Sequence, residues 1–144
     1  MKAAALGLSV GLVSWAGVLY GVSVRELLGW KVRVEKVQFM PSLQAPADKP
    51  FPFLYEICIF NESAETVTLR GRKWIVREEN GDTVVVEGEG VVGEMPVFET
   101  GDEFRYQSYH CVASSAVVMG AYFGETEKGE RVFVRIPEFA LELI

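Results

Sequence analysis

The residues that most often carry chemistry are few in this chain. It contains one histidine, His110, and two cysteines, Cys58 and Cys111. A catalytic dyad needs a nucleophile and a base within hydrogen-bond reach, whereas neighbours such as His110 and Cys111 point to opposite faces of an extended chain. One histidine, two separated cysteines and three aspartates also form no cluster with metal-ligand spacing. We therefore expect no enzyme activity, no catalytic residues, no metal site and no cofactor.

A glycine-rich run is the most suggestive motif. Residues 88–93, with Gly88, Gly90 and Gly93, match the G-x-G-x-x-G pattern that binds a pyrophosphate at the start of a helix. The nearby Pro96 and Gly101 leave no room for that helix, and three glutamates place negative charge around the run. A glycine loop joining two strands is therefore the simpler interpretation. A phosphate would reach the loop only if the neighbouring Arg70 and Arg72 folded over it.

A second pattern imitates immunoglobulin domains. Cys58, Trp74 and Cys111 follow one another in the order of the cysteine–tryptophan–cysteine core, with Tyr109 two residues before the second cysteine. Parity argues against the disulfide, because Cys58 shares its face with Glu56 while the residues of opposite parity are uniformly apolar. We expect two free thiols.

The pattern after Trp30 is typical of strands. Apolar residues recur with a period of two, which indicates strands with one buried face. A phase change after Val34 predicts a bulge, Gly71 predicts another, Asn80-Gly81 predicts a type I′ hairpin, and Pro137 predicts a strand end. Without a convincing helix between the strands, the sequence predicts an all-β sandwich or small barrel. Strands are expected over residues 31–40, 53–60, 66–69, 72–79, 83–87, 103–109, 117–125, 131–136 and 139–143.

Charge divides the chain into two parts. Residues 31–144 form one predicted domain, with 12 basic and 19 acidic side chains and a net charge of −7. Such a domain repels phosphate backbones, so nucleic acid is not an expected partner.

Residues 1–30 form a separate N-terminal segment, in which the 22 residues Ala3–Val24 carry no charge. That length would cross a bilayer as a helix, and the basic residues after it would keep the domain cytoplasmic. A membrane anchor through residues 3–24, an export signal without a clear cleavage site, and a helical extension or misplaced start codon all remain open.

The order of several motifs resembles the ApaG domain family. The similarity extends from Val32 to Leu143, with two departures: Lys73 stands where the family usually has histidine, and residues 114–119 replace a slightly longer segment. The resemblance implies a fibronectin type III-like sandwich of two antiparallel sheets, no established catalytic activity, protein–protein recognition, and a suggested pyrophosphate site at the glycine run. The motifs are Tyr55-x-Ile57-x-Ile59-x-Asn61, Arg72-Lys73-Trp74-x-Val76, Gly88-x-Gly90-Val91-Val92-Gly93-x-x-Pro96, Gly101-x-x-Phe104-x-Tyr106-x-Ser108, Gly120-x-Tyr122 and Ile136-Pro137-x-Phe139.

These observations predict a non-enzymatic binding module for a protein partner. Its expected recognition surface includes the glycine run with Arg70, Arg72 and Trp74, although a tryptophan at such a position is more often a core residue and the two arginines are more often solvated. The alternative is a sensor of a small anion, such as pyrophosphate or a nucleotide, at the same run. An exported immunoglobulin-like receptor is a third hypothesis, which two free thiols would oppose.

Overall fold

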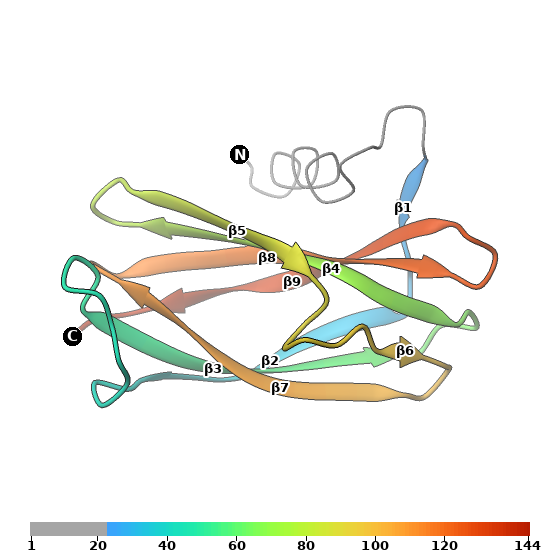
Figure 1. The fold of residues 1–144 in the computed structure, drawn as a ribbon, viewed down its shortest axis with the longest axis horizontal. Helices are drawn as coiled ribbons and strands as arrows, with labels where there is room; N and C mark the ends of the chain where they lie inside the picture. Colours follow the sequence, from blue (N-terminus) through green and yellow to red (C-terminus); the bar gives the residue numbers. More distant parts are fainter. Residues whose placement is uncertain (1–22) are drawn as a thin grey trace.

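The computed structural model describes residues 23–144, and every regular element in that range is a strand (Figure 1). Sheet A has the order β1-β9-β8-β4-β5, with β6 also paired to β4, and sheet B has the order β2-β3-β7. The two sheets lie face to face, which confirms the predicted all-β sandwich. The strands are β1 (Val24–Glu26), β2 (Trp30–Phe39), β3 (Phe51–Asn61), β4 (Val67–Glu78), β5 (Thr83–Glu89), β6 (Val97–Phe98), β7 (Glu103–Val112), β8 (Ala116–Thr126) and β9 (Arg131–Leu141).

The core fills the space between the sheets. Alternate residues of each strand point inward because side chains alternate between the two faces of a strand. Ile57 and Ile59 of sheet B and Leu69 and Trp74 of sheet A are at most 2% exposed. Burying a large apolar side chain contributes roughly 1.5–3 kcal/mol, so this shared layer holds the two sheets together.

Three irregularities bend the strands. The predicted bulges are confirmed, since the register shifts between Val34 and Lys36 and between Leu69 and Gly71. The predicted strand end at Pro137 is wrong, because β9 runs through it. There the register shifts opposite Met119, so Pro137 has no ladder partner. A bulge is a position at which a strand tolerates a proline without an N–H group.

The β4–β5 hairpin forms where Asn80-Gly81 predicts it, but the turn type is different. A type I′ turn needs positive φ at both central residues, and only Gly81 has it, at 101°. The Gly81 N–H donates to the Glu78 carbonyl at 3.0 Å, and the Glu78 N–H donates to the Asp82 carbonyl at 2.8 Å. The Asn80 side chain accepts from the Asp82 N–H at 2.9 Å. That side-chain bond favours a three-residue loop ending in a left-handed glycine.

The sandwich begins earlier than residue 31. β1 pairs in parallel with β9, the single exception to the antiparallel pairing, and Leu27 and Trp30 are core residues. Residues 24–30, assigned above to the N-terminal segment, therefore belong to the fold. The predicted helix and membrane contact fall almost entirely on residues 1–22, outside the described part. Within residues 23–144 there is no helix that would span a bilayer.

Both cysteines are free thiols, as parity predicts. Cys58 is fully buried on the face of β3 that points away from the core, where Arg33 donates a long hydrogen bond to its sulfur at 3.6 Å. The immunoglobulin-type disulfide is therefore absent from this fold.

Candidate functional site

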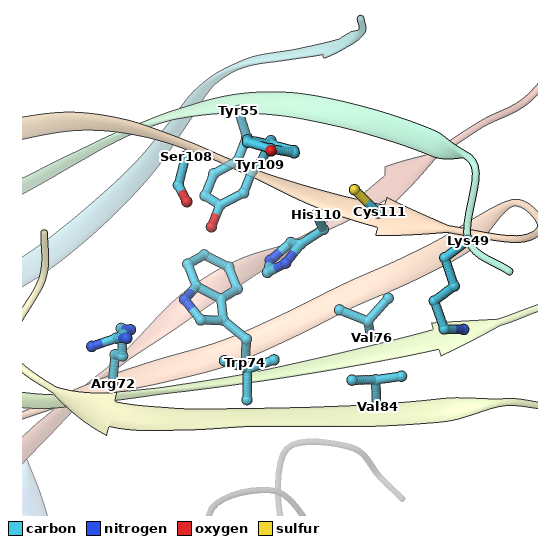
Figure 2. Close-up of a pocket in the computed structure, with 11 residues that line it drawn as sticks. Lys49, Tyr55, Arg72, Trp74, Val76, Val84, Ser108, Tyr109, His110 and Cys111 are labelled. Atoms are coloured by element: carbon cyan, nitrogen blue, oxygen red, sulfur yellow. The ribbon is translucent and has the colours of Figure 1, made fainter. Parts of the chain in front are cut away.

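A pocket of about 350 Å³ opens where each sheet has a free edge (Figure 2). β5 ends sheet A and β7 ends sheet B, and the pocket lies between these two strands. Its floor consists of side chains from β3 and β4 that point into the gap between the sheets. The lining residues are Lys49, Tyr55, Arg72, Trp74, Val76, Val84, Val86, Ser108, Tyr109, His110 and Cys111.

Three rings form the pocket's aromatic floor. His110 stacks on Tyr55 with ring centroids 4.9 Å apart and meets the edge of Trp74 at 5.3 Å. Tyr55 and Trp74 are themselves 5.2 Å apart. The strands dictate this meeting, because Phe53 is the register partner of His110 and brings β7 alongside β3. A floor of packed rings presents a flat, rigid surface to an apolar group.

His110 has an unpartnered nitrogen at this floor. Its Nε2 is buried and has no hydrogen-bond partner among the described residues. Burial disfavours the charged imidazolium and lowers the pKa of His110 to about 4. The imidazole is therefore neutral at pH 7, and its Nε2 is available for a hydrogen bond with a group that enters the pocket.

We expect His110 to make the stability of the domain fall in mild acid. The unfolded state binds a proton at His110 near pH 6.5, whereas the folded state binds it only near pH 4. Stability contributed by the neutral form is thus complete above about pH 6.5 and is lost between that pH and 4, which amounts to roughly 2 kcal/mol at pH 5. Urea unfolding of the wild type and His110→Gln at pH 7.5 and 5.0 measures it. Equal losses in both proteins would contradict this pKa.

Hydroxyl groups continue from the floor into the core. The Tyr106 and Tyr122 hydroxyls are hydrogen-bonded to each other across the sheets, and burial raises the pKa of both tyrosines. Burial also raises the pKa of Tyr55, while a hydrogen bond with Ser108 acts in the opposite direction. These phenols therefore stay protonated at physiological pH and supply neutral donors and acceptors.

An ion pair fixes one end of the pocket. Lys49 Nζ lies 2.5 Å from a Glu78 carboxylate oxygen. The Glu78 side chain is fully buried, and its other oxygen accepts from the N–H groups of Ala113 and Ser114 at 2.8 and 2.9 Å. Burial opposes the Glu78 charge, but the Lys49 hydrogen bond and the two backbone donors outweigh it and lower the pKa of Glu78. One carboxylate thus ties the proline-rich loop before β3 to the loop between β7 and β8.

The glycine run forms a compact strand end and turn beside the pocket. Arg72 Nη1 donates to the carbonyls of Glu89 and Gly90 at 2.8 and 2.9 Å. A Cβ atom on Gly88 would lie 2.8 Å from that guanidinium, so the glycine leaves the space in which Arg72 lies. Arg72 is therefore bound to the loop's carbonyl oxygens, where it stabilises the backbone.

The loop's own N–H groups are largely engaged as well. The Gly90 N–H donates to the Arg70 carbonyl at 2.9 Å, and Val91 and Glu94 exchange two backbone hydrogen bonds of 2.8 Å. Between them, Val92 and Gly93 have φ of 41° and 79°, the left-handed pair that a type I′ turn requires. These amides and Arg72 would have to give up existing partners to hold an anion.

The structure brings together only some of the predicted site residues. Arg72 contacts Gly88 and Gly90, whereas Gly93 lies at the tip of the turn. The Arg70 side chain follows the bulge and lies 4.0 Å from Glu125. Trp74 is 2% exposed and belongs to the core cluster, but its ring also forms part of the pocket floor.

The sequence analysis did not find most of the pocket. Ser108 and His110 have the same parity as Phe104 and Tyr106, so two polar residues occupy inward positions at one end of β7. That break in an otherwise apolar face was the available signal. The position of Lys49 depends on the course of a loop, and periodicity gives no information about it.

The two facing sheets and the pocket at their open edges define a β-sandwich domain of the fibronectin type III kind. A family model described as the ApaG domain matches residues 41–126. Protein ApaG of Rhodopseudomonas palustris (strain TIE-1) is 36% identical over 105 residues, which cover 72% of this chain and 81% of that protein. Protein ApaG of Brucella canis is 35% identical over 116 residues, which cover 80% and 88%.

A solved structure agrees with these relatives. The X-ray structure of Northeast Structural Genomics Consortium target SoR45 superimposes with a TM-score of 0.70 at 31% identity, and the match covers 78% of this chain and 87% of that one. The chain belongs to the ApaG domain family.

Proposed function

We propose that this ApaG domain is a non-enzymatic binding module that holds an extended segment of a protein partner along β5, with one side chain of that segment in the pocket. The observation that carries the proposal is the pocket itself. It opens beside a free strand edge and contains an aromatic floor with an unpartnered His110 nitrogen.

The β5 strand offers backbone groups for such a partner. β5 pairs with β4 on one side only, and a free edge accepts an added strand from another chain through main-chain hydrogen bonds. Val84 and Val86 line the pocket, and Val86 is 37% exposed. Because alternate residues of an added strand point the same way, one of them would enter the pocket over Trp74 and reach His110.

The chemistry of the pocket favours an uncharged side chain. Burial keeps His110 and the tyrosines neutral, and Val76, Val84 and Val86 add an aliphatic wall. Lys49 is paired with Glu78 and Arg72 with loop carbonyls, so neither needs an external anion. An aliphatic or amide side chain would pack on the rings and hydrogen-bond to His110.

Site-specific photocrosslinking in the native host tests this proposal. We expect a photoreactive residue at Val86 to capture one discrete protein, and Val84→Trp, which fills the pocket, to abolish that product. Val97 on β6 is 57% exposed and serves as the matched control for both changes. Loss of the product with Val97→Trp, or its persistence with Val84→Trp, would contradict the proposal.

The anion sensor predicted as the alternative has a separate readout. It requires pyrophosphate or a nucleotide to raise the melting temperature and Arg72→Ala to abolish the rise. A rise of that kind without a crosslinked protein would replace the proposed function by the anion sensor.

A further inference from the structure

The face of sheet A that points away from sheet B is apolar. Its central residues alternate with core residues along β4, β8 and β9, so their side chains point outward. Ile75 pairs with Val85 and Met119, and Phe123 pairs with Phe133. An antiparallel sheet that faces water normally carries polar side chains there. This face is therefore suited to being covered.

The burial of this face requires a covering layer. Phe123 is 1% exposed, and Phe133, Ile75 and Met119 are 7–8% exposed. Sheet B lies against the opposite face of sheet A (Figure 1), and no element among residues 23–144 crosses this one. Neighbouring side chains on an open sheet would leave large apolar groups more accessible, so the cover comes from outside the described range.

We propose that the chain's own residues 3–22 pack on this outer face of sheet A. They are uncharged and rich in alanine, leucine and valine, which makes them complementary to an apolar surface. They join the sheet through β1, where Val24 packs against the cluster of Ala121, Phe123 and Phe133. The segment thus starts at the edge of the face that it covers.

The segment is long enough for this role. Twenty residues span about 30 Å as a helix and more when extended. β8 and β9 contain 11 residues each, or about 36 Å at the strand rise of about 3.3 Å per residue. Residues 3–22 thus cross most of the face in either form. An intramolecular cover has a high effective concentration, which favours it over a bilayer or a second copy.

Trp15 reports on this proposal directly. Trp30 and Trp74 are 1% and 2% exposed, so the difference between the full-length wild type and Trp15→Phe isolates the fluorescence of Trp15. We expect that fluorescence to be blue-shifted and several-fold less quenched by acrylamide than free tryptophan, with no change on dilution. Met119→Glu at the centre of the face should release Trp15 to the quencher, whereas Val97→Glu on β6 should not.

Each other result overturns the proposal. Trp15 that is as accessible as free tryptophan would show that the segment does not cover the face. Shielding that is lost on dilution would assign the cover to a second copy. Stronger quenching by vesicles of brominated phosphatidylcholine and phosphatidylglycerol would assign the segment to a membrane. If Met119→Glu loses its β-sheet circular dichroism, Met119→Gln replaces it, and an unchanged Trp15 signal in that folded variant contradicts docking.

Discussion

Replacement of Glu78 by alanine is expected to lower the free energy of unfolding by about 3 kcal/mol, because removing one partner of a buried, hydrogen-bonded ion pair leaves the other groups uncompensated. The change strands the N–H groups of Ala113 and Ser114 and removes the partner of Lys49. Lys49 is 23% exposed and partly recovers contact with water, which keeps the cost below that of a fully buried charge. Chemical denaturation at pH 7 measures the effect.

The pH dependence identifies the carboxylate as the cause. The folded pKa of Glu78 is lowered, so its contribution is complete above the usual glutamate pKa of about 4.5 and is lost as the pH falls through the folded value. The difference between Glu78→Ala and the wild type should therefore shrink in strong acid. Glu79→Ala, at the exposed neighbouring position, is the control and should change stability by less than about 0.5 kcal/mol. A comparable loss in both variants would contradict the role given to Glu78.

Replacement of Gly120 by alanine should be at least as damaging. A Cβ atom there would lie 2.3 Å from the carbonyl oxygen of Lys73 and 3.1 Å from Ile136. The oxygen belongs to the backbone of the adjacent central strand, so β4 and β8 would have to separate. Overpacking of this kind costs about 1–3 kcal/mol or more, and we expect the upper end because both strands are held on each side. Thermal unfolding followed by circular dichroism measures the loss.

Gly88→Ala provides the matched comparison for Gly120→Ala. Gly88 is also a strand glycine without positive φ, and its Cβ would meet only the guanidinium of Arg72, at 2.8 Å. A flexible side-chain end moves aside easily, so a loss below about 1 kcal/mol is expected. Equal losses in the two variants would show that contact with the backbone is not what distinguishes Gly120.

The sequence predicts the fold well where local pattern decides the structure. Period-two alternation locates most of the strands, and the change of phase after Val34 and the glycine at 71 locate two bulges. It fails at Pro137, where a tertiary register shift opposite Met119 accommodates the proline. It also fails at Asn80, whose side chain stabilises a different turn. Both errors arise from interactions beyond the immediate neighbours.

The candidate site is less predictable because its residues come from separate strands and one loop. Trp74 and Arg72 are found from their motif, but the meeting of Tyr55 with His110 depends on the pairing of β3 with β7. The glycine run attracts attention by its spacing, whereas its structural role depends on the direction in which Arg72 donates. The orientation of a side chain across a loop leaves no periodic signal in the chain.

The order of the strands also has a consequence for synthesis of the protein. Sheet B joins β3 to β7, so Phe51 waits for Val112, and the centre of sheet A is incomplete until β8 ends at Thr126. On the ribosome neither layer therefore closes until nearly the whole chain has emerged. Pairing between such distant segments is slow, in the range of milliseconds to seconds. Throughout that interval the three consecutive valines of β5 are open to other nascent chains.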